Sequence, residues 1–309
     1  MPRKVLLDMD PGVDDAVALC LALAEPKLEV LAVTATGGNV GPEQATRNVQ
    51  TLIEQLDPPR LPRFGVASPN QTLRTAARHL YGADGFCGAQ FAVAEMVHRK
   101  PSIKVLGDEI RSAPGEVTII ALGPLSNIAS LLQSDPDIAT QIGHLIIIGG
   151  ADRVSGNITA AAEFNMYCDP ESAKEVLRSR VTKTMIPLDV TEQLAFGFDF
   201  LDQFRDSKSR TGQFLEQLLP GAYRAYRQRL GLESIYLHDV IAVVAAIHPE
   251  LFTTERAYVD IETSGDITTG ATIVDHRKTN DNQPNVDLVT DIDLVATKDC
   301  ILRGLLGPA

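Results

Sequence analysis

Short apolar runs alternate with helical patterns along residues 4–189. The apolar runs are nearly continuous, which is typical of strands that are buried on both faces. This order predicts an α/β fold with an open, mostly parallel central sheet flanked by helices. A Pro-rich stretch at 57–65 indicates a break. The expected strands are 4–8, 28–36, 116–123, 144–150 and 182–189, and the expected helices are 14–25, 43–56, 124–133 and 169–179.

The sequence after residue 190 has a different pattern. Residues 199–230 and 238–247 are expected to be helical, and strands are expected within 256–263, 270–277 and 285–292. We expect these late strands to pair in an antiparallel manner. The chain has no internal repeat, low-complexity tract or convincing linker, so residues 1–309 are expected to form a single domain.

The composition limits the possible partners. The net charge is −12 and no run is rich in Lys or Arg, so nucleic acid is not an expected partner. No stretch approaches 18 uninterrupted apolar residues, so no membrane span is expected. The four cysteines are scattered without a Cys-x-x-Cys pair, which is typical of reduced thiols in a cytoplasmic protein.

The stretch "DMDPGVDD" brings Asp8, Asp10, Asp14 and Asp15 together where a buried strand runs into a buried helix. Asp14 or Asp15 could simply cap the helix, because carboxylates favour the positive end of its dipole. That interpretation does not account for all four, since carboxylates so close to a core repel one another. A bound cation would remove the repulsion, and hard oxygen ligands suit Ca²⁺ or Mg²⁺.

Polar residues also follow other expected strands, at the edge where ligands bind in such folds. "TGGN" ends at Asn39 and could be a plain turn, since Gly-Gly favours turns. Asn157, Glu163 and Asn165 lie in an otherwise small or apolar segment. Their amides and carboxylate suit the hydroxyl groups of a sugar, although they could equally satisfy buried loop backbone.

His238 and Asp239 directly precede an apolar helical pattern. Asp239 at a helix start is usually a cap, and a lone histidine such as His238 is usually structural. Either residue alone is therefore weak support for a catalytic site.

Together these segments resemble the inosine-uridine-preferring nucleoside hydrolases, a family of Ca²⁺-dependent N-ribohydrolases. The motifs occur in family order over nearly the whole chain. They are "DMDPGVDDA" (8–16), "TGGN" (36–39), "ALGPLSNIA" (121–129), "GN…AEFN…DPE" (156–171) and "HD" (238–239). The resemblance implies hydrolysis of the N-glycosidic bond of ribonucleosides to D-ribose and free base. It also implies the nucleoside hydrolase fold and a homodimer or homotetramer.

The resemblance also implies roles for individual residues. The Ca²⁺ ligands would be the carboxylates of Asp10, Asp15 and Asp239 and the carbonyl of Leu122. Asp10 would also be the general base toward the metal-bound water, and His238 the acid for the leaving base. Asp8 would only support Asp10. The ribose hydroxyls would contact Asp14, Asn39 and Asn165, and the 5′-hydroxyl would contact Asn157 and Glu163.

Two residues depart from the family pattern. Tyr81 stands where many members carry a histidine, and Ile148 stands where a methionine is common. Both are expected near the base, so they leave the choice between purine and pyrimidine nucleosides open. Tyr223, Tyr226 and Tyr236 could contact the base, but each could equally be a helix-packing residue.

Two other functions compete with hydrolysis. A Ca²⁺-dependent ribose or nucleoside binder without turnover would keep the same ligands. A haloacid-dehalogenase-like phosphatase would use an Asp-x-Asp after the first strand as nucleophile and acid/base, and "GDEI" at 107–110 imitates part of its metal motif. That motif should follow a late strand, whereas Gly107 is expected between helical segments.

Overall fold

The computed structural model describes residues 1–309 except 72, 75–77, 95–99, 278–281 and 308–309. Within these residues, eight strands form one open sheet, and all neighbours are parallel except the last pair. This confirms the expected mostly parallel α/β fold. In spatial order the strands are β3 (Arg63–Gly65), β2 (Leu28–Ala35), β1 (Arg3–Met9), β4 (Val117–Ala121), β5 (His144–Ile148), β6 (Lys183–Ile186), β12 (Val286–Ile292) and β9 (Phe252–Ala257).

Some local expectations were wrong. The stretch 57–65, interpreted as a break, contains strand β3. The expected strand 182–189 ends at Ile186, because Pro187 precedes the short helix α8 (Leu188–Thr191). The late strands are not all antiparallel, since β12 joins β6 in parallel and only its other edge, β9, is antiparallel.

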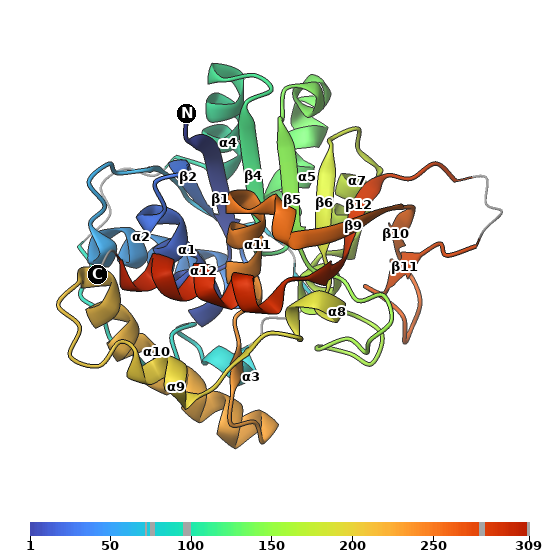
Figure 1. Ribbon diagram of the computed structural model, residues 1–309. Helices are drawn as coiled ribbons and strands as arrows, with labels where there is room; N and C mark the ends of the chain where they lie inside the picture. The colour runs from blue at the N-terminus through green and yellow to red at the C-terminus, as the bar shows by residue number, and fades with distance from the viewer. Residues whose placement is uncertain (72, 75–77, 95–99, 278–281, 308–309) are drawn as a thin grey trace.

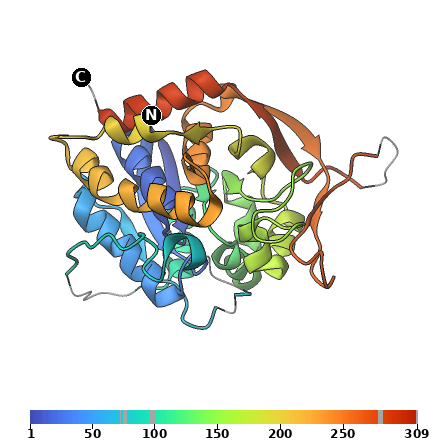
Figure 2. The same cartoon turned by 90° about the horizontal axis from the view of Figure 1, so that it is seen from below.

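Helices cover both faces of the sheet, and successive residues of β1 point alternately to the two layers. Val5 and Leu7 pack in the core under the first layer, whereas Leu6 packs in the core under the second. Figure 2 shows α12 (red) on one side and the green helices on the other. The first layer holds α1 (Val13–Ala24), α2 (Pro42–Leu56), α10 (Arg210–Leu230), α11 (His238–Ile247) and α12 (Leu294–Leu306), and the second holds α4 (Ser102–Ser112), α5 (Ser126–Ser134) and α7 (Pro170–Arg178).

Shorter elements complete the described part of the chain. The expected helix 199–230 is divided into α9 and α10. No described helix is both long and apolar enough to cross a membrane. The remaining elements are α3 (Arg78–Tyr81), α6 (Phe164–Cys168), α9 (Phe198–Asp202), two 3₁₀ turns (Pro136–Thr140 and Pro249–Leu251) and the antiparallel pairs β7 (Ala195–Phe196) with β8 (Ile235–Tyr236) and β10 (Val259–Ile261) with β11 (Thr272–Val274).

The order of the strands reverses at β1, which lies between β2 and β4. The chain leaves β1 toward β2 on one side and reaches β4 on the other, so a crevice opens at the carboxyl ends of β1 and β4. In Figure 1 these ends point toward the lower side of the sheet, where α3 and α8 lie. The "DMDPGVDD" stretch therefore lies at the position where open α/β sheets bind ligands.

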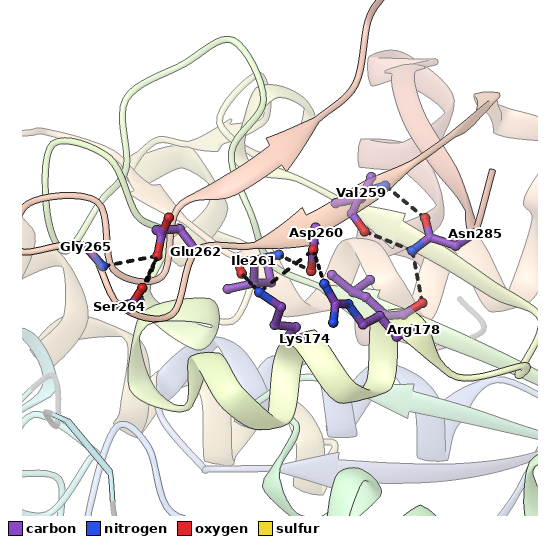
Figure 3. A network of polar contacts seen from close by, with 10 residues as sticks. Lys174, Arg178, Val259, Asp260, Ile261, Glu262, Ser264, Gly265 and Asn285 are labelled. Carbon is purple, nitrogen blue, oxygen red and sulfur yellow. Dashed lines mark hydrogen bonds and ion pairs between the residues drawn. The ribbon is translucent and has the colours of Figure 1, made fainter. Parts of the chain in front are cut away.

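The β10–β11 pair is fixed to the second helix layer by a polar network (Figure 3). Arg178 of α7 donates to the carboxylate of Asp260 on β10, with 2.6 Å between Nη2 and Oδ2. The side chain of Asn285 accepts from the amide of Val259 and donates to its carbonyl, both at 2.9 Å. This network holds the pair beside the end of the sheet.

Candidate active site

The first turn of α1 carries two of the candidate carboxylates, and both are buried. Asp15 Oδ2 accepts the amide of Gly12 at 2.8 Å, so Asp15 does cap the helix. Its other oxygen, like Oδ1 of Asp14, has no hydrogen-bond partner among the described residues. Helix capping therefore accounts for one oxygen of Asp15 but not for the unpartnered oxygens of Asp14 and Asp15.

Asp10 lies directly after β1, in a space that two glycines leave open. Its Oδ2 accepts the amide of Asn39 at 2.5 Å. A Cβ atom on Gly38 or Gly123 would collide with the Asp10 carboxylate, so any side chain there would displace it. "TGGN" is thus more than a turn, because its glycine and its Asn39 amide both shape the surroundings of Asp10.

Asp239, in the first turn of α11, faces the two carboxylates of α1. One oxygen from each of Asp14, Asp15 and Asp239 lies within 4.8 Å of the others, and all three side chains are buried. Burial raises the pKa of Asp14 to about 6 and that of Asp15 to about 8, the latter with the help of the Asp14 charge. Burial and the nearby carboxylates also raise the pKa values of Asp10 and Asp239.

Asp8 is separate from this group. Its Oδ1 accepts from Thr34 Oγ1 at 2.6 Å and from Asn127 Nδ2 at 2.8 Å, which ties β1 to β2 and α5. Its backbone carbonyl accepts the amide of Leu122 at 2.8 Å. Asp8 therefore holds β1 to its neighbours β2 and α5 beside the crevice. The carboxylate group consists of Asp14, Asp15 and Asp239 and does not include Asp8.

The segment 156–165 satisfies its own backbone with the residues expected to bind sugar. Glu163 caps α6, accepting the amides of Asn165 (2.9 Å), Met166 (3.1 Å) and Gly150 (3.0 Å). Asn157 Oδ1 accepts the amide of Phe164 at 2.9 Å. Asn157 and Glu163 thus satisfy buried loop backbone, which was the alternative to sugar binding. Both residues still line the same cavity as Asp14.

Asn165 links two strand ends across the crevice. Its Nδ2 donates to the carbonyl of Leu122 after β4 at 2.8 Å and to that of Ile148 at the end of β5 at 3.2 Å. Asn39 reaches the same region, with its Nδ2 at 3.4 Å from Asp15 Oδ2. The candidate ligand Leu122 is therefore hydrogen-bonded to one candidate ribose contact, Asn165, and the other, Asn39, is hydrogen-bonded to the carboxylates of Asp10 and Asp15.

His238 begins α11 beside Asp239. Its Nδ1 is 2.8 Å from Thr191 Oγ1, and its ring stacks on Tyr236 with centroids 5.7 Å apart. Burial lowers the pKa of His238 to about 4, so the ring is neutral at pH 7. Thr191 and Tyr236 together fix the plane and position of the imidazole.

These side chains surround a cavity of about 390 Å³. One part of its wall is polar and contains the buried carboxylates and amides. The other part is mainly apolar and aromatic, and includes Ile148 and Tyr81, the two departures from the family pattern. The polar part comprises Asp14, Asn39, Leu122, Asn157, Glu163, Asn165 and Asp239, and the apolar part includes Leu80, Tyr81, Ile148, Ile158, Ile186, Leu188, Tyr226, Leu230, Leu232 and Tyr236.

A family model described as "Inosine-uridine preferring nucleoside hydrolase" matches residues 5–299. The chain belongs to this family. As a nucleoside hydrolase it cleaves ribonucleosides to ribose and free base.

The similar nucleoside hydrolases have names that state different base preferences. The pyrimidine-specific ribonucleoside hydrolase RihA of Salmonella paratyphi B is 35% identical over 308 residues, covering 99% of both chains. Among solved structures, a plant nucleoside hydrolase is 30% identical, covers 100% of both chains and superposes with a TM-score of 0.91. A purine-preferring ribonucleoside hydrolase from Gardnerella vaginalis is 28% identical, with a TM-score of 0.91 and 99% and 98% coverage.

The fold of this nucleoside hydrolase excludes the phosphatase hypothesis. Residues 107–110 lie inside helix α4, whereas the phosphatase metal motif must follow a strand. The polar cavity residues that sequence reasoning missed are Thr191, which ends the four-residue helix α8, and Glu192, which follows it. Neither residue stands in a recognisable motif.

Of the three tyrosines considered for the base, Tyr226 and Tyr236 line the cavity. Tyr223 does not, because its hydroxyl donates to the carbonyls of Phe196 and Gly197 and its ring stacks on Phe198. Tyr223 is therefore a packing residue.

Proposed function

We propose that Asp10, Asp15 and Asp239, with the carbonyl of Leu122, hold a Ca²⁺ ion at the crevice. The observation that carries this proposal is a group of buried carboxylate oxygens without partners, including Oδ1 of Asp10 and of Asp15. Buried anionic oxygens without compensation are costly, and an all-oxygen donor set suits a hard cation. The N-termini of α1 and α11 offset part of the repulsion, because both helices direct their positive ends at these side chains.

The polar part of the cavity is proposed to bind ribose. Asp14, Asn39 and Asn165 present carboxylate and amide groups to its 2′- and 3′-hydroxyls, while Asn157 and Glu163 lie toward its 5′-hydroxyl. The backbone contacts of Glu163 do not prevent this role, since a carboxylate accepts several hydrogen bonds. These contacts also hold the carboxylate in place before the substrate arrives.

Asp10 is proposed to be the general base. Its carboxylate is fixed by the Asn39 amide and lies next to the ribose-binding groups, so it can take the proton of the water that attacks C1′. A cation held by these residues would supply positive charge that lowers the pKa of a nearby water and attracts the ribose hydroxyls. The surrounding carboxylates stabilise the oxocarbenium-like charge that develops on the sugar.

His238 is proposed to assist the departing base. It lies between the carboxylate group and the aromatic part of the wall, where Thr191 and Tyr236 fix its ring. From this position the neutral ring can donate an N–H hydrogen bond to the base as the glycosidic bond breaks.

The deciding experiment measures reducing-sugar release from inosine, adenosine, cytidine and uridine, with added Ca²⁺ and after exhaustive chelation. We expect turnover that chelation abolishes and Ca²⁺ restores. Undiminished turnover after chelation would contradict the cation assignment. Nucleoside binding in Ca²⁺ without any release of sugar would instead indicate the binding protein without turnover.

A further inference from the structure

Glu192 lines the cavity but belongs to neither the proposed cation site nor the proposed ribose site. It follows α8 directly, and its backbone amide donates to the carbonyl of Leu188 at 3.0 Å. The preceding residue, Thr191, contacts Nδ1 of His238. The backbone at Glu192 is therefore fixed next to the residue that is proposed to assist the leaving base.

Glu192 lies close in the chain to residues that meet the aromatic part of the cavity. Strand β7 begins three residues later, and its Ala195 pairs with Tyr236 of β8. Tyr236 in turn stacks on His238. The proposed ribose contacts come from other segments, namely the start of α1, the loop after β2 and the segment from 157 to 165 that leads into α6. A nucleoside whose sugar occupies the polar part would direct its base toward the side that carries Glu192.

Glu192 is a solvent-exposed residue of the cavity lining, and its carboxylate has no hydrogen bond or ion pair with the part of the chain that the structure describes. Partial desolvation and the charge of Asp189 raise the pKa of Glu192. Asp189 is already engaged, because its two oxygens accept the amides of Asp152 and Arg153 at 2.8 Å each. Glu192 thus adds to the cavity lining a carboxylate that no protein group engages, and it differs in this from the buried Glu163, which three amides hold.

We infer that Glu192 is a specificity residue that accepts a hydrogen bond from the amino group of the nucleobase and favours cytidine over uridine. This inference rests on the proposed function, since it requires the sugar in the polar part of the cavity. An ionised carboxylate only accepts, so it suits the N4 amino group of cytosine. Uracil carries a carbonyl oxygen at the same position, and two acceptors facing each other repel.

The test compares wild type with Glu192→Gln, using kcat/KM for cytidine, uridine and p-nitrophenyl riboside. The amide of Gln can donate to the uracil carbonyl, so the cytidine-to-uridine ratio should fall about tenfold, the effect of one hydrogen bond of about 1.4 kcal/mol. The loss on cytidine should exceed any loss on p-nitrophenyl riboside, which lacks a base. Glu233→Gln is the matched control, because it removes the same charge from an exposed residue between α10 and β8 that does not line the cavity.

Three outcomes would overturn the inference. An unchanged cytidine-to-uridine ratio would show that Glu192 does not contact the base. Equal losses on all three substrates would assign Glu192 to the shared site or to folding, and an equal change in the Glu233→Gln control would assign the effect to net charge. Failure of the proposed function would look different, because wild type would then release no sugar from any of the substrates, and the inference would fall with it.

Discussion

Acidic side chains have opposite surroundings at two places in the molecule, strand β10 and the crevice. On β10, Asp260 lies beside Arg178 at 2.6 Å and Lys174 at 3.8 Å. At the crevice, Asp14 and Asp15 are buried without a basic partner in the described chain, and burial raises their pKa values. The difference teaches where to look for function, since acids paired by the protein stabilise structure, whereas buried unpaired acids need a ligand to compensate them.

The largest expected effect comes from Asp10→Asn. Removing the proposed base should lower kcat by about 10²–10⁴-fold on every nucleoside. The side-chain oxygen of the new Asn can still accept the hydrogen bond from the Asn39 amide, so the local structure should be kept. Steady-state kinetics of sugar release measures this loss. Asp260→Asn, on strand β10, is the control that should leave kcat unchanged. Near-normal turnover by the Asp10 variant would remove Asp10 from the mechanism.

His238→Ala should have a smaller and selective effect. Nucleosides need help for the departing base, so their kcat should fall by about 10²-fold. p-Nitrophenyl riboside has a good leaving group and should lose far less. Comparing the two substrates in the same preparation separates leaving-group assistance from misfolding, and equal losses would contradict the assigned role of His238.

Chelation should change how stability depends on pH. Without a cation, Asp14 and Asp15 have pKa values of about 6 and 8, above the usual 3.8, so they are ionised more readily in the unfolded chain. Stability should therefore fall as pH rises from about 4 to 8, because the unfolded chain loses its protons first. Thermal melts in chelator and in Ca²⁺ test this, because Ca²⁺ binds the ionised carboxylates and should remove the fall. The same slope in both conditions would argue against a cation there.

Breaking the ion pair between Arg178 and Asp260 of the β10–β11 pair gives the smallest expected effect. The side chain of Arg178 is 56% exposed, and such ion pairs contribute about 0–1 kcal/mol. Arg178→Ala should thus lower the free energy of unfolding by less than about 1 kcal/mol in urea titrations and leave kcat unchanged. A large loss of activity would mean that the paired region also supports the site.

How much the sequence predicts differs between local and distant features. Asp10, Asp14 and Asp15 could be predicted from one motif, because a strand and a helix place them together. Asp239 and Leu122 needed the family resemblance, since no local pattern shows that their segments meet α1. The position of β12 between β6 and β9 was missed for the same reason, because an apolar strand does not specify its neighbours.

The wall of the cavity was the least predictable part. Tyr223 and Tyr226 are three residues apart on one helix, yet only Tyr226 lines the cavity, because the hydroxyl of Tyr223 is engaged by β7 and the residue after it. Glu192 carries no signal in the sequence, since an acidic residue after a short helix is commonplace on protein surfaces. Both distinctions depend on tertiary packing.

Helices α1 and α11 pack against each other with their first turns at the carboxylate group, although they lie far apart in the chain (Figure 1). During synthesis on the ribosome, Asp14 and Asp15 emerge long before Asp239. A nascent chain that stops short of α11 carries only part of the proposed ligand set. If the proposed ligand set holds the cation, tight uptake requires synthesis to pass α11, and translation products truncated before it should be left without the ion.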